Sequence, residues 1–487
     1  MSTPKVLVVV FDGLRPDHVT PDRAPAIHGF AQSGVRMTRT ASAFPSETRV
    51  QVTTLTTGHP PVGHGIMANA FYDPRLGFDS AMDTSDDARM RAADQAYGRL
   101  IGASHLSEIL WGADKKYAAL TTGKVGNARL LAGRAAELNQ PVLSIWGDAI
   151  STPAARYKSV VDRFGSPPEQ QFPNIGVVDW AVTVLLDHVL PDHAPDVCVL
   201  WLNEPDLSYH YRGVASADAE TAINAVDNGF ARILDWWRAE GQAEGWNIIA
   251  LSDHGHVTVE GQVDVAAALT AGGLSVGPAI GPDVDIALKP GYSAHAAVRD
   301  RDPALTERLI AVLREVDWCG PILTRDARAE DHGALPLSVV NWHHPRAADV
   351  AFTLRARDAD SDGGLPGVIL ADNPDIPLGG GMHGGLHPVE LNHCLFLGGG
   401  AFRTGVVSKT PTGIVDIAPT ILRLIGVPIH PLMAGRALEE AFNHGGPAPT
   451  VLETVHEAGR DSYAQRIVTA SVAGAARPYL RGGMRVS

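Results

Sequence analysis

Short apolar runs recur along the chain, and each stops abruptly at a polar residue or a glycine. Runs that are apolar at successive positions are typical of strands buried on both faces, as in a parallel sheet covered by helices. Helical patterns lie between several of them. This alternation predicts a doubly wound, mostly parallel α/β sheet with helices on both faces. The predicted strands are 5–11, 117–120, 142–146, 196–202, 247–251 and 393–397, and the predicted helices include 179–189, 217–240 and 414–425.

The pattern changes near residue 256, where Pro, Gly and Asp become frequent and the candidate strands, such as 348–354, become short. We expect an inserted α+β cap over residues 256–380, between a first part of the catalytic core at 1–255 and a second part at 381–443. After Asn443 the sequence His-Gly-Gly-Pro-Ala-Pro predicts a break. The tail, 444–487, is expected to hold one or two short helices and is a candidate arm of a homo-oligomer.

The composition is that of an ordinary globular protein, and 487 residues are enough for a large core and an added module. The formal net charge of −14 argues against a nucleic acid polymer as partner but allows a small anionic substrate, because a metal ion can outweigh the global field locally. The three cysteines suggest no disulfide framework. The apolar stretch at 6–11 is too short for a signal peptide, and no run is long enough to span a membrane. We therefore expect a cytoplasmic protein without a membrane partner.

Acidic residues follow three of the predicted strands. Asp12 ends the first strand, and Asp206 follows the fourth strand with His210 four positions later, on the same face of a helical turn. Asp253 and His254 follow the fifth strand. Chemistry in doubly wound sheets collects at the carboxyl ends of the strands, and carboxylate oxygen with imidazole nitrogen suits Zn²⁺. Each residue alone could instead cap a helix or lie on the surface.

Other histidines are candidates for the same site. His383 lies in a glycine-rich segment just before the last predicted strand, where it could reach a metal or a ligand, and His387 is its competitor. His256 is either a supporting group behind the ligands or a plain loop residue. His343 and His344 are interpreted as residues of a cap loop. The chain has 20 histidines, so most of them must have other roles.

A hydroxyl nucleophile is suggested by the segment Phe-Pro-Ser-Glu-Thr that ends at Thr48. A helix can run from Thr48 to Thr57, with Gly58 as its stop. The N-terminus of a helix favours anions, and a hydroxyl there can ionise beside a metal ion and attack phosphorus. The alternative is that Thr48 or Ser46 only caps the helix.

Taken together and in this order, these segments resemble the alkaline phosphatase superfamily, in particular its nucleotide pyrophosphatase/phosphodiesterase branch, which includes phosphonoacetate hydrolase. The resemblance covers most of the predicted core and implies an alkaline-phosphatase-like fold. The motifs that carry it are Phe-Asp12-Gly, Phe-Pro-Ser-Glu-Thr48, Thr57-Gly58, His64-Gly65-Ile66, Asn69, Phe-Tyr-Asp73, Glu-Pro-Asp206-Leu-Ser-Tyr-His210, Ser-Asp253-His254-Gly, Met-His383-Gly and Val415-Asp416-Ile-Ala-Pro419-Thr420.

The resemblance implies a hydrolase of small phosphate diesters or phosphonates that uses two zinc ions, with Mn²⁺ or Fe as other candidates. Thr48 would be the nucleophile and form a phospho-threonine, and Asn69 would bind a non-bridging phosphoryl oxygen. Arg49 begins a segment that departs from the family's usual Phe-Pro-Asn. The resemblance therefore does not predict the residues of the leaving-group pocket. The implied ligands are Asp206, His210 and His383 for one ion, and Asp12, Thr48, Asp253 and His254 for the other.

Two other readings remain. The segment at Lys124 resembles the part of phosphonoacetate hydrolase that carries two substrate-binding lysines; Lys124 matches one, the second falls near Gly126, and Arg129 is a candidate substitute. This favours carbon–phosphorus cleavage as an alternative, although the segment could be a solvated loop. A reading of another class is a non-catalytic metal-binding protein on this fold. The full set of ligands and the nucleophile favour an enzyme.

Overall fold

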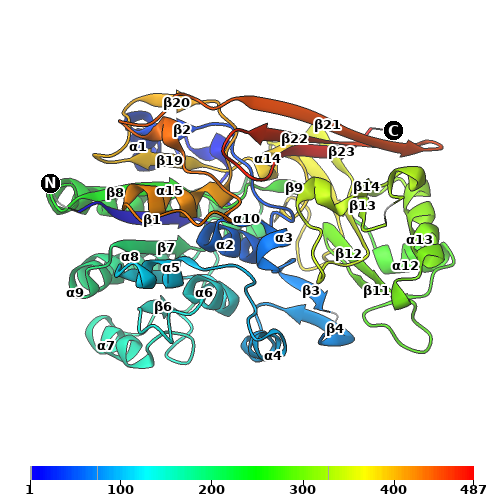
Figure 1. The fold of residues 1–487 in the computed structure, drawn as a ribbon, viewed down its shortest axis with the longest axis horizontal. Coiled ribbons are helices and arrows are strands. Elements are labelled where there is room, and N and C mark those ends of the chain that lie inside the picture. The colour runs from blue at the N-terminus through cyan, green and yellow to red at the C-terminus, as the bar shows by residue number, and fades with distance from the viewer. Residues whose placement is uncertain (1–2, 74, 327, 487) are drawn as a thin grey trace.

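The computed structural model describes residues 3–73, 75–326 and 328–486 and contains an eight-stranded sheet, which lies in the left half of Figure 1. The strand order is β20-β2-β19-β8-β1-β7-β5-β6. Every neighbouring pair is parallel except the two pairs made by β19. The predicted mostly parallel sheet is therefore confirmed. Its strands are β1 (Lys5–Phe11), β2 (Val35–Met37), β5 (Tyr117–Thr121), β6 (Val142–Ser144), β7 (Val197–Leu202), β8 (Trp246–Leu251), β19 (Leu395–Gly398) and β20 (Val406–Ser408).

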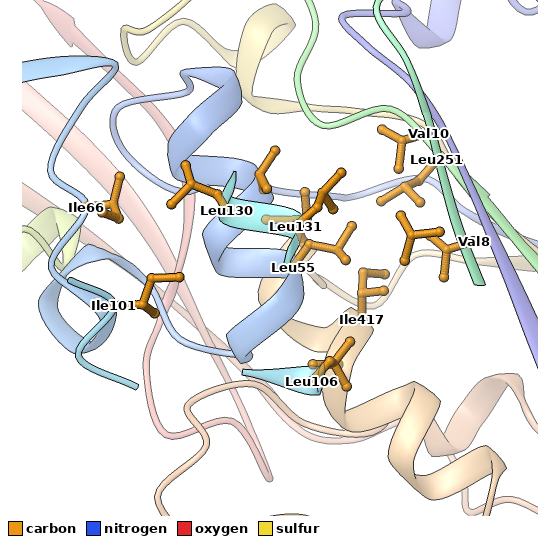
Figure 2. Close-up of a cluster of buried hydrophobic side chains, with 14 of the residues drawn as sticks. Val8, Val10, Leu55, Ile66, Ile101, Leu106, Leu130, Leu131, Leu251 and Ile417 are labelled. Carbon is orange, nitrogen blue, oxygen red and sulfur yellow. The ribbon is translucent and has the colours of Figure 1, made fainter. Parts of the chain in front are cut away.

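Helices cover both faces of this sheet, which explains why its strands are apolar at successive positions. Side chains alternate along β1, so Val8 and Val10 join one hydrophobic cluster and Val9 and Phe11 join the other. Figure 2 shows Val8 and Val10 beside Leu251, within the first cluster. The helices of that cluster include α2 (Thr48–Thr57), α5 (Leu106–Gly112), α6 (Val125–Ala132) and α15 (Ile417–Leu424), and those of the opposite face include α1 (Pro25–Ser33), α8 (Ile175–Val184) and α11 (Ala217–Trp236).

The helix predicted for the nucleophile segment forms with the predicted ends. Helix α2 begins at Thr48 and stops at Gly58, whose φ of +66° is in the left-handed region that glycine adopts most easily. Among the described residues, no helix combines the length and the hydropathy needed to cross a bilayer. The remaining helices are α3 (Pro61–His64), α4 (Asp87–Tyr97), α7 (Ala154–Phe164), α9 (Leu190–His193), α10 (Asp206–Arg212), α12 (Val265–Ala271), α13 (Pro303–Glu315) and α14 (Pro388–Leu391).

The expected insertion forms sheets of its own. One has six strands in the order β10-β11-β12-β15-β13-β14, and another has four in the order β16-β17-β9-β18. Because β9 and β18 pair, the two ends of the insertion meet beside the core. The division at residues 256 and 380 stays a prediction. The strands are β9 (Val257–Gln262), β10 (Val276–Gly277), β11 (Ile286–Lys289), β12 (Ser293–Val298), β13 (Cys319–Thr324), β14 (Leu335–Pro336), β15 (Val350–Leu354), β16 (Ala356–Asp360), β17 (Pro366–Ala371) and β18 (Gly381–Met382), and a separate hairpin consists of β3 (Ala70–Asp73) and β4 (Gly77–Asp83).

The prediction of short helices in the tail is wrong. The described part of the tail forms a three-stranded antiparallel sheet, β21 (Val451–Arg460), β22 (Tyr463–Val472) and β23 (Tyr479–Arg485). Strand β22 largely alternates buried and more exposed positions, which is the period of a strand with one covered face. In Figure 1 these red strands run from the core towards the inserted sheets, and the Tyr479 hydroxyl donates to Asp416 of the core at 2.9 Å. The tail thus ties the two parts together.

Truncation of a core side chain behind the nucleophile should destabilise the whole domain. Leu55 of α2 is fully buried in the first cluster, so Leu55→Ala should lower the free energy of unfolding by roughly 2–5 kcal/mol. Denaturant unfolding followed by circular dichroism measures this. Leu432→Ala is the matched control, because Leu432 is 75% exposed and should change stability by less than about 0.5 kcal/mol. Equal effects of the two substitutions would contradict the assigned packing.

Candidate metal and active site

Three buried carboxylates meet at the carboxyl ends of adjacent strands. Asp12 follows β1, Asp253 follows β8, and Asp206 opens α10 after β7. The strand order β8-β1-β7 places these three strand ends side by side. The sheet therefore brings together the acidic residues that the sequence placed after separate strands.

The first group of potential ligands surrounds Asp206. Its Oδ1 lies 3.2 Å from His210 Nε2, 3.4 Å from His383 Nε2 and 3.1 Å from His256 Nε2. One ligand atom of each of the four residues lies within 4.8 Å of the others. The three residues predicted for one metal ion are thus together, and His256 joins them.

The second group consists of Asp12, Asp253 and His254. His254 Nε2 lies 3.5 Å from Asp12 Oδ1 and 3.3 Å from Asp253 Oδ2. The hydroxyl of Thr48 is 3.4 Å from the same nitrogen. All four residues predicted for the second ion therefore converge.

The hydrogen bonds around both groups fit a pair of metal ions. Among the described residues, Oδ1 of Asp12, Oδ1 of Asp206 and Oδ2 of Asp253 are buried without a hydrogen-bond partner. An acceptor left in this way costs about 1–3 kcal/mol, which a cation would offset. We infer that these oxygens are arranged for cations.

The imidazoles are oriented in the way that metal ligands usually are. Nδ1 of His210 donates to the Gly381 carbonyl at 2.6 Å, and Nδ1 of His383 donates to the Ser46 carbonyl at 2.6 Å. His254 Nδ1 lies 3.0 Å from the carbonyl of the next residue. A histidine that donates one N–H to a carbonyl presents the lone pair of its other nitrogen. In each case that nitrogen is Nε2, which faces the carboxylates.

The electrostatics of the site are those of a cluster with excess negative charge. Burial, followed by the charges of Asp253 and Asp206, raises the pKa of Asp12 well above its usual value. Burial also raises the pKa of Asp253 to about 7. Burial opposes ionisation of Asp206 too, but His210, His256 and His383 together outweigh it and lower the pKa of this carboxyl well below its usual value. Two of the three carboxyls thus ionise reluctantly until positive charge is supplied.

The nucleophile candidate stands at the start of a helix. Thr48 is the first residue of the ten-residue helix α2, and the N–H groups in the first turn of a helix lack helical partners and favour anions. The Arg49 amide donates to Asn69 Oδ1 at 3.1 Å. Because the side-chain oxygen of Asn69 accepts this bond, its side-chain nitrogen, Nδ2, can donate to a bound anion. Thr48 and Asn69 line one cleft together.

This cleft has a volume of about 560 Å³, and its floor contains Asp12, Asp206 and His383. Core and insertion both contribute walls. From the core come Arg49, Lys124 and Asn127, and from the insertion come Lys289, Tyr292, His295 and the loop at 372–376.

The structure separates the two predicted substrate-binding residues. Lys124 lines the cleft. Arg129, one turn along α6, instead donates to Asp87 Oδ1 at 2.5 Å and to the Ala149 carbonyl at 3.0 Å. The structure therefore does not bring Arg129 to the site, because a nearer carboxylate engages its guanidinium.

Sequence reasoning missed the place of His256. The motif Asp-His-Gly-His after a strand marked His256 as a candidate. The sequence could not show, however, that its ring faces Asp206. His387 lies outside both groups: it caps α14, and its Nε2 is 3.0 Å from Asp358. The insertion's contributions, Lys289 and Tyr292, carried no recognisable motif.

Comparison with known proteins gives a consistent result. A model of the family described as type I phosphodiesterase/nucleotide pyrophosphatase matches residues 6–351. Human ectonucleotide pyrophosphatase/phosphodiesterase family member 1 is 24% identical over 256 residues, which are 52% of this chain and 24% of the human protein. A bis(5'-adenosyl)-triphosphatase of Xenopus laevis is 36% identical over 72 residues, 15% of this chain and 16% of that protein. The aligned parts span about a quarter or less of these two relatives.

Solved structures with a similar fold include murine ectonucleotide pyrophosphatase/phosphodiesterase 5, with a TM-score of 0.62 and 17% identity over 90% of this chain and 100% of the mouse chain. An inactive variant of the mouse protein in complex with AMP gives a TM-score of 0.60 and 17% identity over 88% of this chain and 96% of that chain. At this level of identity the likeness shows the fold, and it confirms the predicted alkaline-phosphatase-like architecture.

Cation binding to this site should release protons. Below pH 7 the Asp253 carboxyl, with its pKa raised to about 7, is partly protonated, so a metal ion must displace that proton. Apparent affinity for Zn²⁺ or Mn²⁺ should therefore rise as the pH increases from 6 to 8. Titration calorimetry in buffers of different ionisation enthalpy measures the protons released. Asp253→Asn is the control and should bind less metal; an unchanged metal content by elemental analysis would refute its assignment as a ligand.

Proposed function

Because the chain belongs to the type I phosphodiesterase/nucleotide pyrophosphatase family, we propose that it hydrolyses small phosphate diesters or phosphonates at a centre for two metal ions, with Thr48 as the nucleophile. The observation that carries the proposal is the convergence of the two ligand groups with the Thr48 hydroxyl beside one cleft, which is lined by Asp12, Thr48, Asp206, His210 and His383.

The donors of both groups are nitrogen and oxygen. We assign Asp206, His210 and His383 to one ion and Asp12, Thr48, Asp253 and His254 to the other. A set without thiolate suits Zn²⁺, and Mn²⁺ and Fe are the other candidates. When bound, the two ions would lower the pKa of the threonine hydroxyl, neutralise phosphoryl charge and stabilise the leaving oxygen.

The protein's own groups position the reaction. The Thr48 hydroxyl attacks phosphorus, and the departing alcohol or nucleotide leaves a phospho-threonine that water then hydrolyses. The amide of Asn69 and the N-terminus of α2 stabilise charge on the non-bridging oxygens. No Asp or Glu has to act as a general base in this scheme.

The cleft supports a small substrate rather than a polymer. Its volume of about 560 Å³ lies in the range of small-molecule sites, and the chain's formal net charge of −14 does not favour nucleic acid. The inactive variant of the mouse relative was solved in complex with AMP, which supports a nucleotide or a similar ester as the substrate class. The cytoplasmic location and homo-oligomer stay predictions.

Carbon–phosphorus cleavage of a phosphonate is the second candidate, and Lys124 is the observation that favours it. Its side chain lines the cleft, and no hydrogen bond or ion pair engages it among the described residues. Burial, and then the charge of Arg49, lowers its pKa. An ammonium held without a partner in a cleft is suited to a second anionic group on the substrate.

A paired assay separates the two candidates. Metal-loaded protein is offered bis-p-nitrophenyl phosphate and phosphonoacetate, with a chelator control. We expect chelator-sensitive release of nitrophenol and no phosphate from phosphonoacetate. Phosphate from phosphonoacetate would assign carbon–phosphorus hydrolysis instead and make Lys124 the next residue to substitute. The absence of both products would mean either that the insertion selects a narrower substrate or that the metal site is not catalytic.

Removal of the nucleophile should abolish turnover while the fold persists. Thr48→Ala should lower kcat on the active substrate by on the order of 10⁴-fold or more, because the attacking oxygen is lost. Thr56→Ala is the matched control: Thr56 lies near the other end of α2, its hydroxyl bonds only to the Val52 and Thr53 carbonyls, and its loss should leave kcat within about threefold. Full activity of Thr48→Ala would refute the assignment of Thr48 as the nucleophile.

A further inference from the structure

His256 stands in the same relation to Asp206 as the two histidines assigned to its metal ion. The ring centroids of His210, His256 and His383 are 5.1 Å apart in every pair. Their Nε2 atoms lie 3.1–3.4 Å from Asp206 Oδ1. Donors bound tetrahedrally at 2.0–2.1 Å from one zinc ion are roughly 3.3 Å apart. The arrangement is that of four ligands around one position.

The hydrogen bonds of His256 point to the same role. Its Nδ1 is 3.2 Å from the Gly13 carbonyl, which can only accept, so Nδ1 carries the proton. In a neutral imidazole Nε2 then presents a lone pair, and that lone pair faces the Asp206 oxygen at 3.1 Å. Both atoms are buried without a hydrogen-bond partner among the described residues. Two facing acceptors repel each other unless a cation lies between them.

The ring is also held in place. Gly13 has a φ of +71°, and a Cβ there would stand 2.4 Å from His256 Cε1. A Cβ on Gly381 would stand 2.7 Å from His256 Cδ2. The Tyr209 ring packs edge-on against the imidazole, with centroids 5.0 Å apart. Two glycines therefore make room for a ring that cannot turn away from Asp206.

We propose that His256 is a fourth protein ligand of the ion at Asp206, which makes this centre one aspartate and three histidines. The inference rests on the two-metal function proposed above. Catalytic zinc sites usually keep three protein ligands and one open position. With four protein donors, a substrate oxygen would be a fifth ligand, which would favour ions that readily accept five or six ligands, such as Mn²⁺, Fe²⁺ or Co²⁺.

Cobalt-loaded full-length protein, labelled with ¹⁵N-histidine, tests the assignment by counting ligands directly. Each histidine bound to Co²⁺ through Nε2 shows one strongly shifted, exchangeable Nδ1–H signal in the NMR spectrum. We expect four such signals, from His210, His254, His256 and His383. His256→Gln should lose one signal and bind Co²⁺ at least about 10-fold more weakly.

His393→Gln is the matched control. His393 is also buried, with Nδ1 2.9 Å from the Cys394 carbonyl and an unpartnered Nε2, but it belongs to neither ligand group. It should keep all four signals. Three signals in the unsubstituted protein, with bound cobalt and phosphodiesterase activity, would overturn the role of His256 alone. Absence of bound cobalt would overturn the metal centre as well. If His256→Gln does not fold, the count in the unsubstituted protein decides.

Discussion

Electrostatic repulsion among three buried carboxylates is the constraint on which the site depends. Adjacent parallel strands deliver Asp12, Asp206 and Asp253 to one edge of the sheet, where burial denies them water. Without cations, Asp12 and Asp253 would tend to hold protons, because burial raises the pKa of both, that of Asp253 to about 7. The imidazoles and the N-terminus of α2 surround these carboxylates. This arrangement suits a site in which cations, rather than protons, balance the negative charge.

Much of the fold could be predicted because its signals are local. The apolar run of β1 matches the observed strand, and Gly58 marks the end of α2. The meeting of the three carboxylates could be expected because residues after parallel strands share an edge, whereas the two ligand sets were implied by the family resemblance. The prediction of one or two short helices after the break at Asn443 was wrong. The alternation in β22 is a strand pattern, and its covered face appears only when the tail packs on the insertion and core.

Side-chain direction is what the sequence could not supply. His256 and His387 looked alike as loop histidines, yet one ring faces Asp206 and the other caps a short helix. Lys124 and Arg129 share a segment, but Asp87 engages only the arginine. The sequence also did not predict which residues line the leaving-group side of the cleft. Lys289 and Tyr292 line it from the insertion, far along the chain from Thr48.

Ser46 joins the two sides of the site through the polypeptide itself. Its carbonyl accepts from His383, its hydroxyl accepts from Gly384 N at 2.8 Å and donates to the buried Glu390 at 3.0 Å, and it stands two residues before Thr48. The proposed nucleophile and a proposed ligand of the other ion are thus held by one segment of backbone. The distance between the proposed nucleophile and the site of the opposite ion is therefore set by the fold of the protein, before any ion or substrate binds.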